Sequence, residues 1–132
     1  MVYLVPLGRF LYSAIFLMTV MGHFSAGYIG YAAQAGVPAP GLLVPLSGVI
    51  ATLGGLSITL GYKARIGAWL IVLFLVPVSF KMHNFWAVTD PMMRGLQMAL
   101  FMKNVSMLGA ALLITHFGAG PLSLDARRPP VV

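Results

Sequence analysis

Eight side chains with ligand-binding chemistry lie in apolar stretches of this sequence. Lysine, histidine and carboxamide groups donate hydrogen bonds to a ligand oxygen, and tryptophan packs against a ring. These types together are typical of a site for a quinone-like ring or a lipid head group. The candidate ligand-binding residues are His23, Lys81, His83, Asn84, Trp86, Gln97, Lys103 and Asn104.

Other chemistries lack the residues they require. The chain has no cysteine, which excludes disulfides, thiolate nucleophiles and iron–sulfur ligation. Two histidines without a nearby carboxylate are too few to predict a metal site, so no metal is expected. No Ser-His-Asp arrangement, phosphate loop or HExxH motif is present. Catalytic residues stay unknown, and the sequence favours a protein that is not an enzyme on its own over an enzyme.

The composition indicates an integral membrane protein with a single domain. Of the 132 residues, 60% are hydrophobic and 8% are charged, and the mean hydropathy is +0.95. Water-soluble domains carry about 25% charged residues. A helix that crosses a bilayer needs about 20 mostly apolar residues, and the chain has room for four.

The elements that position the candidate residues are therefore membrane spans. We predict an all-α membrane protein, an antiparallel four-transmembrane-helix bundle with a short interfacial helix at 27–36 between the first two spans. A polar cytoplasmic tail, expected to lie flat or to be disordered, follows at 118–132. The predicted spans are residues 4–24, 41–62, 66–86 and 95–117.

The net charge of +6 is distributed along the chain in a way that predicts topology rather than nucleic-acid binding. The basic residues stand singly at the ends of apolar runs, where they contact anionic lipid or, as expected for Arg9, snorkel to the surface. The side with more of them is predicted to be cytoplasmic, together with both termini. That side carries Arg9, Lys63, Arg65, Arg127 and Arg128.

An antiparallel bundle brings the candidate residues into one half of the membrane, the outer leaflet. The acids there are few: Asp90 is in a loop, from which it could fold back over the cluster, and Asp125 is in the tail. A lysine near the middle of a bilayer costs about 2.5–3.5 kcal/mol. The lysines are therefore expected to meet carbonyls, Asn or His acceptors, water, a lipid phosphate, a ligand oxygen or a partner's acid.

The leading hypothesis assigns roles around such a ligand. Lys103 and His83 donate to its oxygen, Asn104 and Asn84 orient it, and Trp86 packs on its ring together with Phe85. Because Lys103 and Asn104 are adjacent on one helix, at most one of them points fully inward. The simpler interpretations are that the lysines snorkel, that the histidines are interfacial, and that the cluster merely holds the helices together.

A ridge of small residues on the second span supports a different function. Small side chains four residues apart let another helix approach closely. The partner is either a helix of the same subunit, which we favour, or a second copy. In the second case the protein is a non-catalytic oligomeric or scaffold membrane protein. A small-solute transporter is less favoured, because the chain is short and has no acid at the midplane. The ridge consists of Ser47, Ala51, Gly55 and Thr59.

Several short motifs resemble one family along nearly the whole chain. The most specific are Phe101-Met102-Lys103-Asn104 and the segment 118–125, Gly-Ala-Gly-Pro-Leu-Ser-Leu-Asp. The others are Gly8-Arg9, Gly36-Val37-Pro38, Leu53-Gly54-Gly55-Leu56, Leu60-Gly61, Arg65 and His83-Asn84-Phe85-Trp86. With these motifs the chain resembles the DoxX family of small four-helix proteins of the bacterial inner membrane.

That resemblance implies a location and a redox setting. It implies a multi-pass protein of the inner (plasma) membrane, associated with quinone-linked systems, with a bound quinone or lipid and a redox-enzyme partner subunit. The family takes its name from a subunit of a thiosulfate:quinone oxidoreductase. Two positions depart from the family pattern: His23 stands where a lysine is frequent, and Thr52-Leu53 stand where a glutamate precedes the double glycine. The acid–base pair of such relatives is therefore missing.

Overall fold

A computed structural model describes residues 1–127 of the chain. Within that range the ordered elements are helical, and three of them are short 3₁₀ turns. In chain order they are α1 (Leu4–Met18), η1 (Val20–Phe24), α2 (Ala26–Gln34), α3 (Pro40–Leu60), α4 (Ala64–Met82), η2 (Phe85–Ala87), α5 (Pro91–Phe117) and η3 (Asp125–Arg127).

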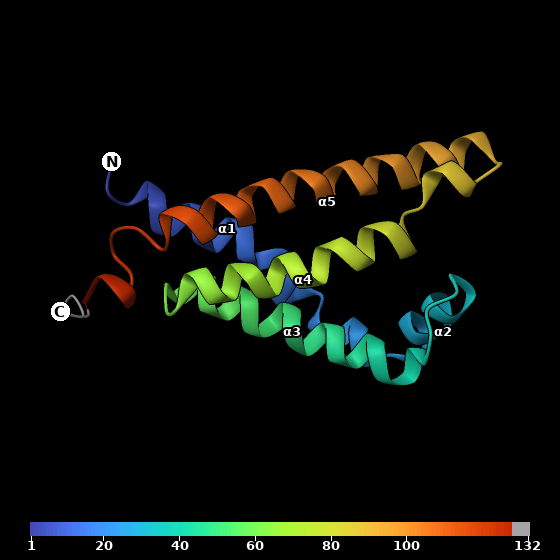
Figure 1. The fold of residues 1–132 in the computed structure, drawn as a ribbon, viewed down its shortest axis with the longest axis horizontal. Helices are drawn as coiled ribbons and strands as arrows, with labels where there is room; N and C mark the ends of the chain where they lie inside the picture. Colours follow the sequence, from blue (N-terminus) through green and yellow to red (C-terminus); the bar gives the residue numbers. More distant parts are fainter. Residues whose placement is uncertain (128–132) are drawn as a thin grey trace.

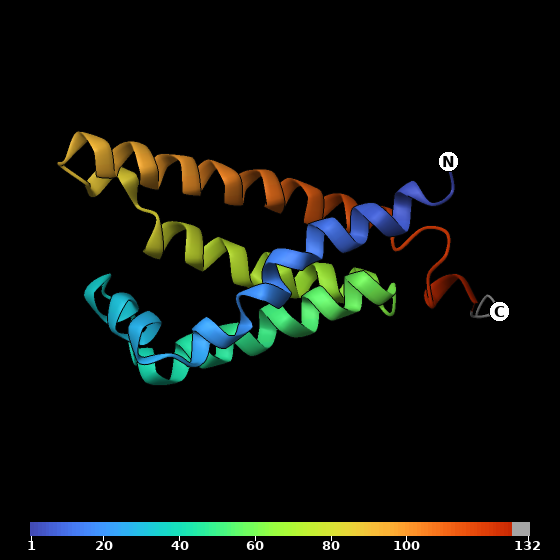
Figure 2. The same ribbon diagram turned by 180° about the vertical axis from the view of Figure 1, so that it is seen from behind.

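The long helices form an antiparallel bundle, as the sequence predicts. Four stretches of the described chain are long and apolar enough to cross a membrane: Leu4–Phe24, Pro40–Leu60, Ala64–Ala87 and Pro91–Phe117. α3 lies between α1 and α4, and α5 packs on the other side of α4 (Figure 1). The predicted fold class is confirmed. We call the end that holds the described termini the terminal end, and the end with α2 and η2 the distal end (Figures 1 and 2).

Several element boundaries differ from the sequence prediction: α4, for example, ends at Met82, four residues before the predicted end of the third span. The first span is α-helical only to Met18 and continues as the 3₁₀ turn η1. The fourth span begins about one turn earlier than expected, at Pro91. There the Asp90 carboxylate accepts a hydrogen bond from the Met93 backbone N–H at 2.8 Å. Asp90 is thus the cap of α5, and Pro91 stands at a position where its missing N–H costs nothing.

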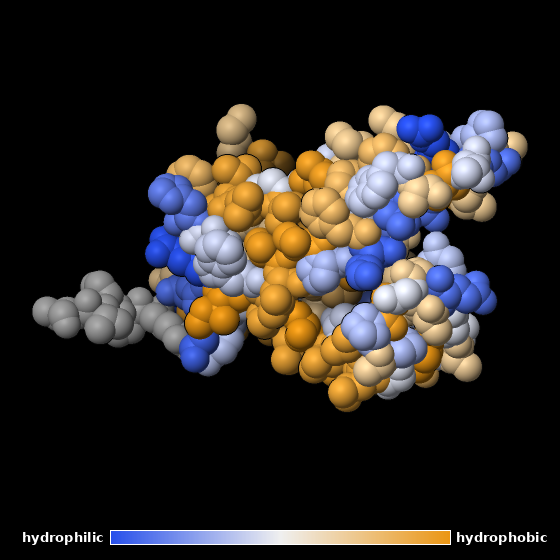
Figure 3. Space-filling model, turned by 45° about the vertical axis from the view of Figure 1, so that its right-hand side comes forward, coloured by the Kyte–Doolittle hydropathy of each residue, from blue (hydrophilic) through white to orange (hydrophobic). Residues whose placement is uncertain are grey.

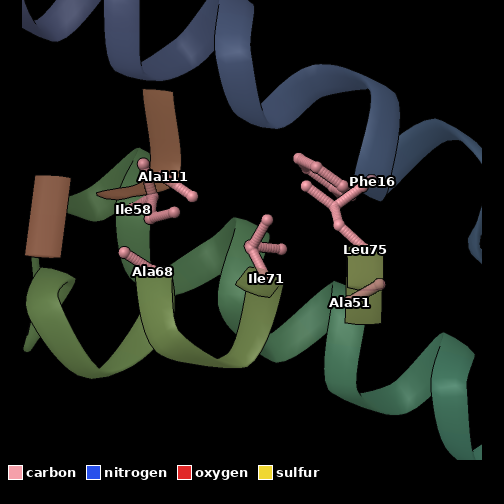
Figure 4. Close-up of a cluster of buried hydrophobic side chains, with 7 residues drawn as sticks. All are labelled: Phe16, Ala51, Ile58, Ala68, Ile71, Leu75 and Ala111. Atoms are coloured by element: carbon pink, nitrogen blue, oxygen red, sulfur yellow. The ribbon is translucent and has the colours of Figure 1, made fainter. Parts of the chain in front are cut away.

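Small side chains set the spacing at the centre of the bundle. Gly54 of α3 and Gly67 of α4 approach so closely that a methyl group on Gly54 would lie 2.9 Å from the Gly67 carbonyl oxygen. The surrounding core fills the space where the four spans meet (Figure 4). It consists of Phe16, Ala51, Ile58, Ala68, Ile71, Leu75 and Ala111.

The small-residue ridge of α3 lies against α1 of the same chain. Ala51 and Gly55 are buried, and a methyl group on Gly55 would lie 3.3 Å from Phe16 Cβ. The Ser47 hydroxyl donates to the Val44 carbonyl at 2.7 Å, and Thr59 Oγ1 is buried. Ala51 and Gly55 thus pack against α1, whereas Ser47 and Thr59 are partly exposed.

The segment after α5 closes the terminal end instead of leaving it as a loose tail. Arg9, which is 6% exposed, extends its guanidinium into this segment. It donates hydrogen bonds to the carbonyls of Ala119, Pro121 (3.3 Å) and Leu122 (2.6 Å). The prediction that Arg9 snorkels to the surface is therefore wrong. Backbone carbonyls from the other end of the sequence surround its guanidinium instead.

Asp125 completes this closure. Its carboxylate accepts from the backbone N–H groups of Lys63 at 2.7 Å and Ala64 at 3.0 Å, at the start of α4. Its own N–H donates to the Gly61 carbonyl at 2.7 Å. Gly61 has φ +63°, and a side chain there would collide with Ser123. We call Arg9, Asp125 and the backbone groups they bind the terminal clasp. The expected disorder is wrong for 118–127; Arg128 and the rest of the predicted tail lie outside the described residues.

Candidate binding pocket at the distal end

A cavity of about 140 Å³ lies between α1 with η1, α2, α4 and α5. We call it the distal pocket. Figure 3 shows hydrophilic residues where the surface is hollowed between the lobe of α2 and the lobe at the start of α5. Val78, on its wall, is about 21 Å along the helix axis from the start of α4. In a hydrocarbon core about 30 Å thick, that depth is in the distal half. The lining residues are Ile15, Phe16, Thr19, His23, Tyr28, Phe74, Leu75, Val78, His83, Lys103, Asn104 and Met107.

His23 forms one wall of the pocket and is held from three directions. Its Nδ1 lies 3.0 Å from the Thr19 carbonyl oxygen, and because a carbonyl only accepts, Nδ1 carries a hydrogen. The ring packs edge-on against Tyr28 and Phe74, with centroids 5.9 and 5.7 Å away. A methyl group on Gly48 of α3 would lie 2.5 Å from His23 Cβ. The ring therefore stands where it does because residue 48 has no side chain.

His83 lines the pocket just after the end of α4 and is tied to two other elements. Its Nδ1 lies 2.8 Å from Gln97 Oε1 of α5, and Gln97 Nε2 lies 3.2 Å from the Tyr31 hydroxyl of α2. Gln97 itself is 8% exposed and does not line the cavity. It acts as a positioning residue that fixes His83 and fastens α2 across the distal end.

Lys103 and Asn104 both line the pocket, although they are adjacent on α5. Asn104 is 5% exposed, whereas Lys103 remains largely exposed. Within residues 1–127 neither side chain has a hydrogen-bond or ion-pair partner. The Asn104 carboxamide atoms are not among the fully buried polar atoms that lack a partner, so they reach the open space of the cavity. The arrangement therefore leaves an unused donor pair at a cavity, with aromatic and aliphatic walls around it.

Four of the predicted ligand-binding residues are not on this cavity: Gln97, Lys81, Asn84 and Trp86. Lys81 is exposed at the end of α4, and Asn84 lies in the connection after it. Trp86 joins an aromatic cluster with Phe85 and Phe101, at centroid distances of 5.3 and 5.7 Å. η2 places the Trp86 ring against Phe101 of α5, and this contact holds it away from the cavity.

The apolar wall of the pocket comes instead from residues that sequence reasoning did not select. Phe16 and Thr19 stand seven and four residues before His23, at helical spacing, and that common face was a usable signal. Phe74 and Val78 lie in an uninterrupted apolar run with no polar marker. Nothing in such a run identifies which face is turned to a cavity.

A second, larger cavity of about 470 Å³ lies at the terminal end, beside Lys63, Arg65 and Asp125. Its buried polar side chain, Ser123, is fully engaged: the hydroxyl donates to the Gly120 carbonyl at 2.7 Å and accepts from the Ala126 N–H at 3.1 Å. Asp125, the acid that lines this second cavity, belongs to the terminal clasp. The distal pocket, despite its smaller volume, is therefore the better candidate site.

Comparison with known proteins places the chain among membrane proteins. The SURF4 family model matches residues 43–129. The inner membrane protein YphA of Escherichia coli (strain K12) is 34% identical over 101 residues, which cover 76% of this chain and 71% of that protein. The ER-derived vesicles protein ERV29 of Saccharomyces cerevisiae is 30% identical over 69 residues, 52% of this chain and 22% of the yeast protein. No solved structure matches the chain.

These matches correct the family prediction. The resemblance to DoxX proteins is wrong, because the model that matches two thirds of the chain is that of the SURF4 family. The quinone-linked redox role and the redox-enzyme partner followed from that resemblance and lose their support with it. The membrane character of the prediction stands.

Proposed function

Because this chain belongs to the SURF4 family and is a multi-pass integral membrane protein, we propose a binding role for it inside the bilayer. The distal pocket receives the polar head group of a membrane-dissolved amphiphile. One observation carries the proposal: the nearly buried carboxamide of Asn104 has no hydrogen-bond partner among the described residues, and it lines the cavity next to Lys103. Polar groups at this depth are costly unless something satisfies them.

The volume of the pocket limits what it receives. Sites for drug-sized ligands enclose about 300–1,000 Å³, whereas this cavity measures about 140 Å³. Since a water molecule occupies about 30 Å³ in the liquid, there is room for a compact head group and not for a whole amphiphile. The apolar remainder of the ligand has to extend into lipid.

The test is to identify what the protein carries out of the membrane. We expect protein extracted in lipid–polymer discs to carry an amphiphile enriched over the surrounding lipid, detected by mass spectrometry. Asn104→Leu should lose that enrichment without losing the fold, because it breaks no hydrogen bond within the described part of the protein. Ser106→Leu, on an exposed position of the same helix, is the matched control. Identical lipid profiles for all three proteins would reject the role and favour the scaffold alternative.

The orientation in the membrane follows the distribution of charge. The similarity to an inner membrane protein supports the same location. The terminal end carries Arg9, Lys63, Arg65 and Arg127, so we assign it and both termini to the cytoplasm, and the distal pocket to the outer leaflet. Because the chain has no cysteine, single cysteines report sidedness cleanly.

In spheroplasts, a membrane-impermeant maleimide should label Ala87→Cys in η2 directly. Ala126→Cys, at the terminal end, should react only after the membrane is opened. Both alanines are exposed, so accessibility rather than burial decides the result. The opposite labelling pattern would reverse the assigned orientation.

A further inference from the structure

The charge of the distal pocket narrows the chemical class of the head group, an inference that rests on the binding role proposed above. Among the described residues that line the distal pocket, Lys103 is the only lysine or arginine, and there is no aspartate or glutamate. Both acids of the sequence are engaged elsewhere: Asp90 caps α5, and Asp125 belongs to the terminal clasp. The pocket is therefore a positive site that lacks an internal counterion, and an anion is its complement.

The unsatisfied hydrogen-bonding groups point in the same direction. A lysine ammonium offers three donors and no acceptor, and the Asn104 carboxamide offers two donors. Among the described residues no protein group accepts from either side chain. Phosphate and carboxylate oxygens accept hydrogen bonds, and bonds to an ionised partner are the stronger ones. A neutral hydroxyl head group would leave the ammonium uncompensated.

Both α1 and α5 line the pocket, so we place the exit for the apolar part of such a ligand between them. These two helices draw near each other at the start of α1 and separate toward η1 (Figures 1 and 2). Their packing partners are different: α1 packs on α3, and α5 packs on α4. The Tyr12 hydroxyl bridges them by donating to the Met107 carbonyl at 2.9 Å. Met107 also lines the pocket, so the cavity begins directly beyond this bridge.

The edges of this gap are already suited to lipid. Met18 and Met21, beside the lining residue Thr19, are 82% and 78% exposed. On α5, Met102 precedes the lining residue Lys103 and is 50% exposed. We propose that the distal pocket binds the phosphate or carboxylate head of a lipid, whose acyl chains leave the bundle between α1 and α5.

The experiment measures ligand binding to the purified, full-length protein by native mass spectrometry. The probes are dioleoyl phosphatidic acid, oleate, dioleoylglycerol and inorganic phosphate. We expect both anionic lipids to bind at least about tenfold more tightly than dioleoylglycerol, the ratio that one charge-assisted hydrogen bond supplies. Inorganic phosphate should bind more weakly than phosphatidic acid, because it gains nothing from the gap between the helices.

Variants assign the preference to Lys103. Lys103→Met should abolish it, Lys103→Arg should retain it, and Asn104→Leu should weaken the binding of both anionic lipids. Lys81→Met is the matched control, because Lys81 is an exposed lysine at the same end of the bundle but off the cavity. Thermal unfolding of each variant separates loss of ligand from loss of fold.

The failures are distinguishable. Equal binding of dioleoylglycerol and phosphatidic acid, unchanged in Lys103→Met, would overturn the anionic head group while leaving the binding role in place. Binding of none of the lipids would overturn the binding role itself. Inorganic phosphate competing on equal terms with phosphatidic acid would overturn the lipid as the source of the anion. An equal effect of Lys81→Met would remove the assignment to the distal pocket.

Discussion

Arg9 at the terminal end and Lys103 in the distal pocket are both cations in spans that contain no carboxylate, but their surroundings differ. Arg9 is 6% exposed and donates to three backbone carbonyls. Lys103 and its neighbour Asn104 face a cavity with no partner in the described chain.

The difference teaches what each end of the bundle is built for. The terminal end closes on itself, because a folded-back segment supplies acceptors from a distant part of the chain. At the distal end Lys103 and Asn104 keep their donors free beside a cavity, whereas at the terminal end Arg9 Nε is a buried donor without a partner among the described residues. Free donors are unfavourable for stability, and we infer that those of the distal pocket serve a ligand. The substitutions below test this contrast, in order of decreasing expected effect on stability.

Arg9→Met should cause the largest loss. It leaves the carbonyls of Ala119, Pro121 and Leu122 without their donor, and we expect the free energy of unfolding to fall by about 3 kcal/mol. Thermal unfolding in detergent and limited proteolysis of the C-terminal segment provide the measurement. Arg65→Met, an exposed arginine at the same end, is the control. Equal stabilities of the two variants would remove the distinction between the ends.

Gly48→Ala should disturb the distal pocket through its wall. The new methyl group would lie 2.5 Å from His23 Cβ, so η1 has to shift, at a cost of about 2 kcal/mol. The same unfolding assay applies, and binding of the anionic lipids should fall with it. Gly109→Ala meets nothing within 4 Å and should be neutral or slightly stabilising. A tolerated Gly48→Ala would contradict the tight placement of the His23 ring.

Asp125→Ala should cost about 1 kcal/mol, the usual value of a lost helix cap. The carboxylate serves two N–H groups at the start of α4. Asp90→Ala removes a single capping bond at the distal end and should cost less. Comparing the two midpoints of thermal unfolding tests whether the terminal end depends more on its acid than the distal end does.

Asn104→Leu should have the smallest effect on stability, within about 0.5 kcal/mol of the unaltered protein or above it. The substitution deletes a buried carboxamide that has no protein partner. Thermal unfolding in a lipid-free detergent measures this without a ligand contribution. A loss comparable to that of Arg9→Met would show that Asn104 holds the bundle together, and the two ends would then be alike.

The sequence specified much of the fold because lipid permits few backbone solutions. A spanning segment has to be helical, so hydropathy and length locate the four spans, and antiparallel order brings His23, His83, Lys103 and Asn104 to the same depth. The start of α5 was recoverable too: Asp90-Pro91 is the cap and first-turn pair of a helix. Depth along each helix is therefore readable from residue counts.

Rotation about each helix axis and the choice of partner were decided by the tertiary structure alone. Glycines without local signature, Gly48 and the pair Gly54 and Gly67, set how closely the helices approach, and so which side chains reach the cavity. That packing buried Asn104, turned Trp86 away and brought carbonyls more than a hundred residues distant to Arg9. The hydrophobic pattern is almost uniform around α3, α4 and α5, so it carries no record of the face that each of them turns inward.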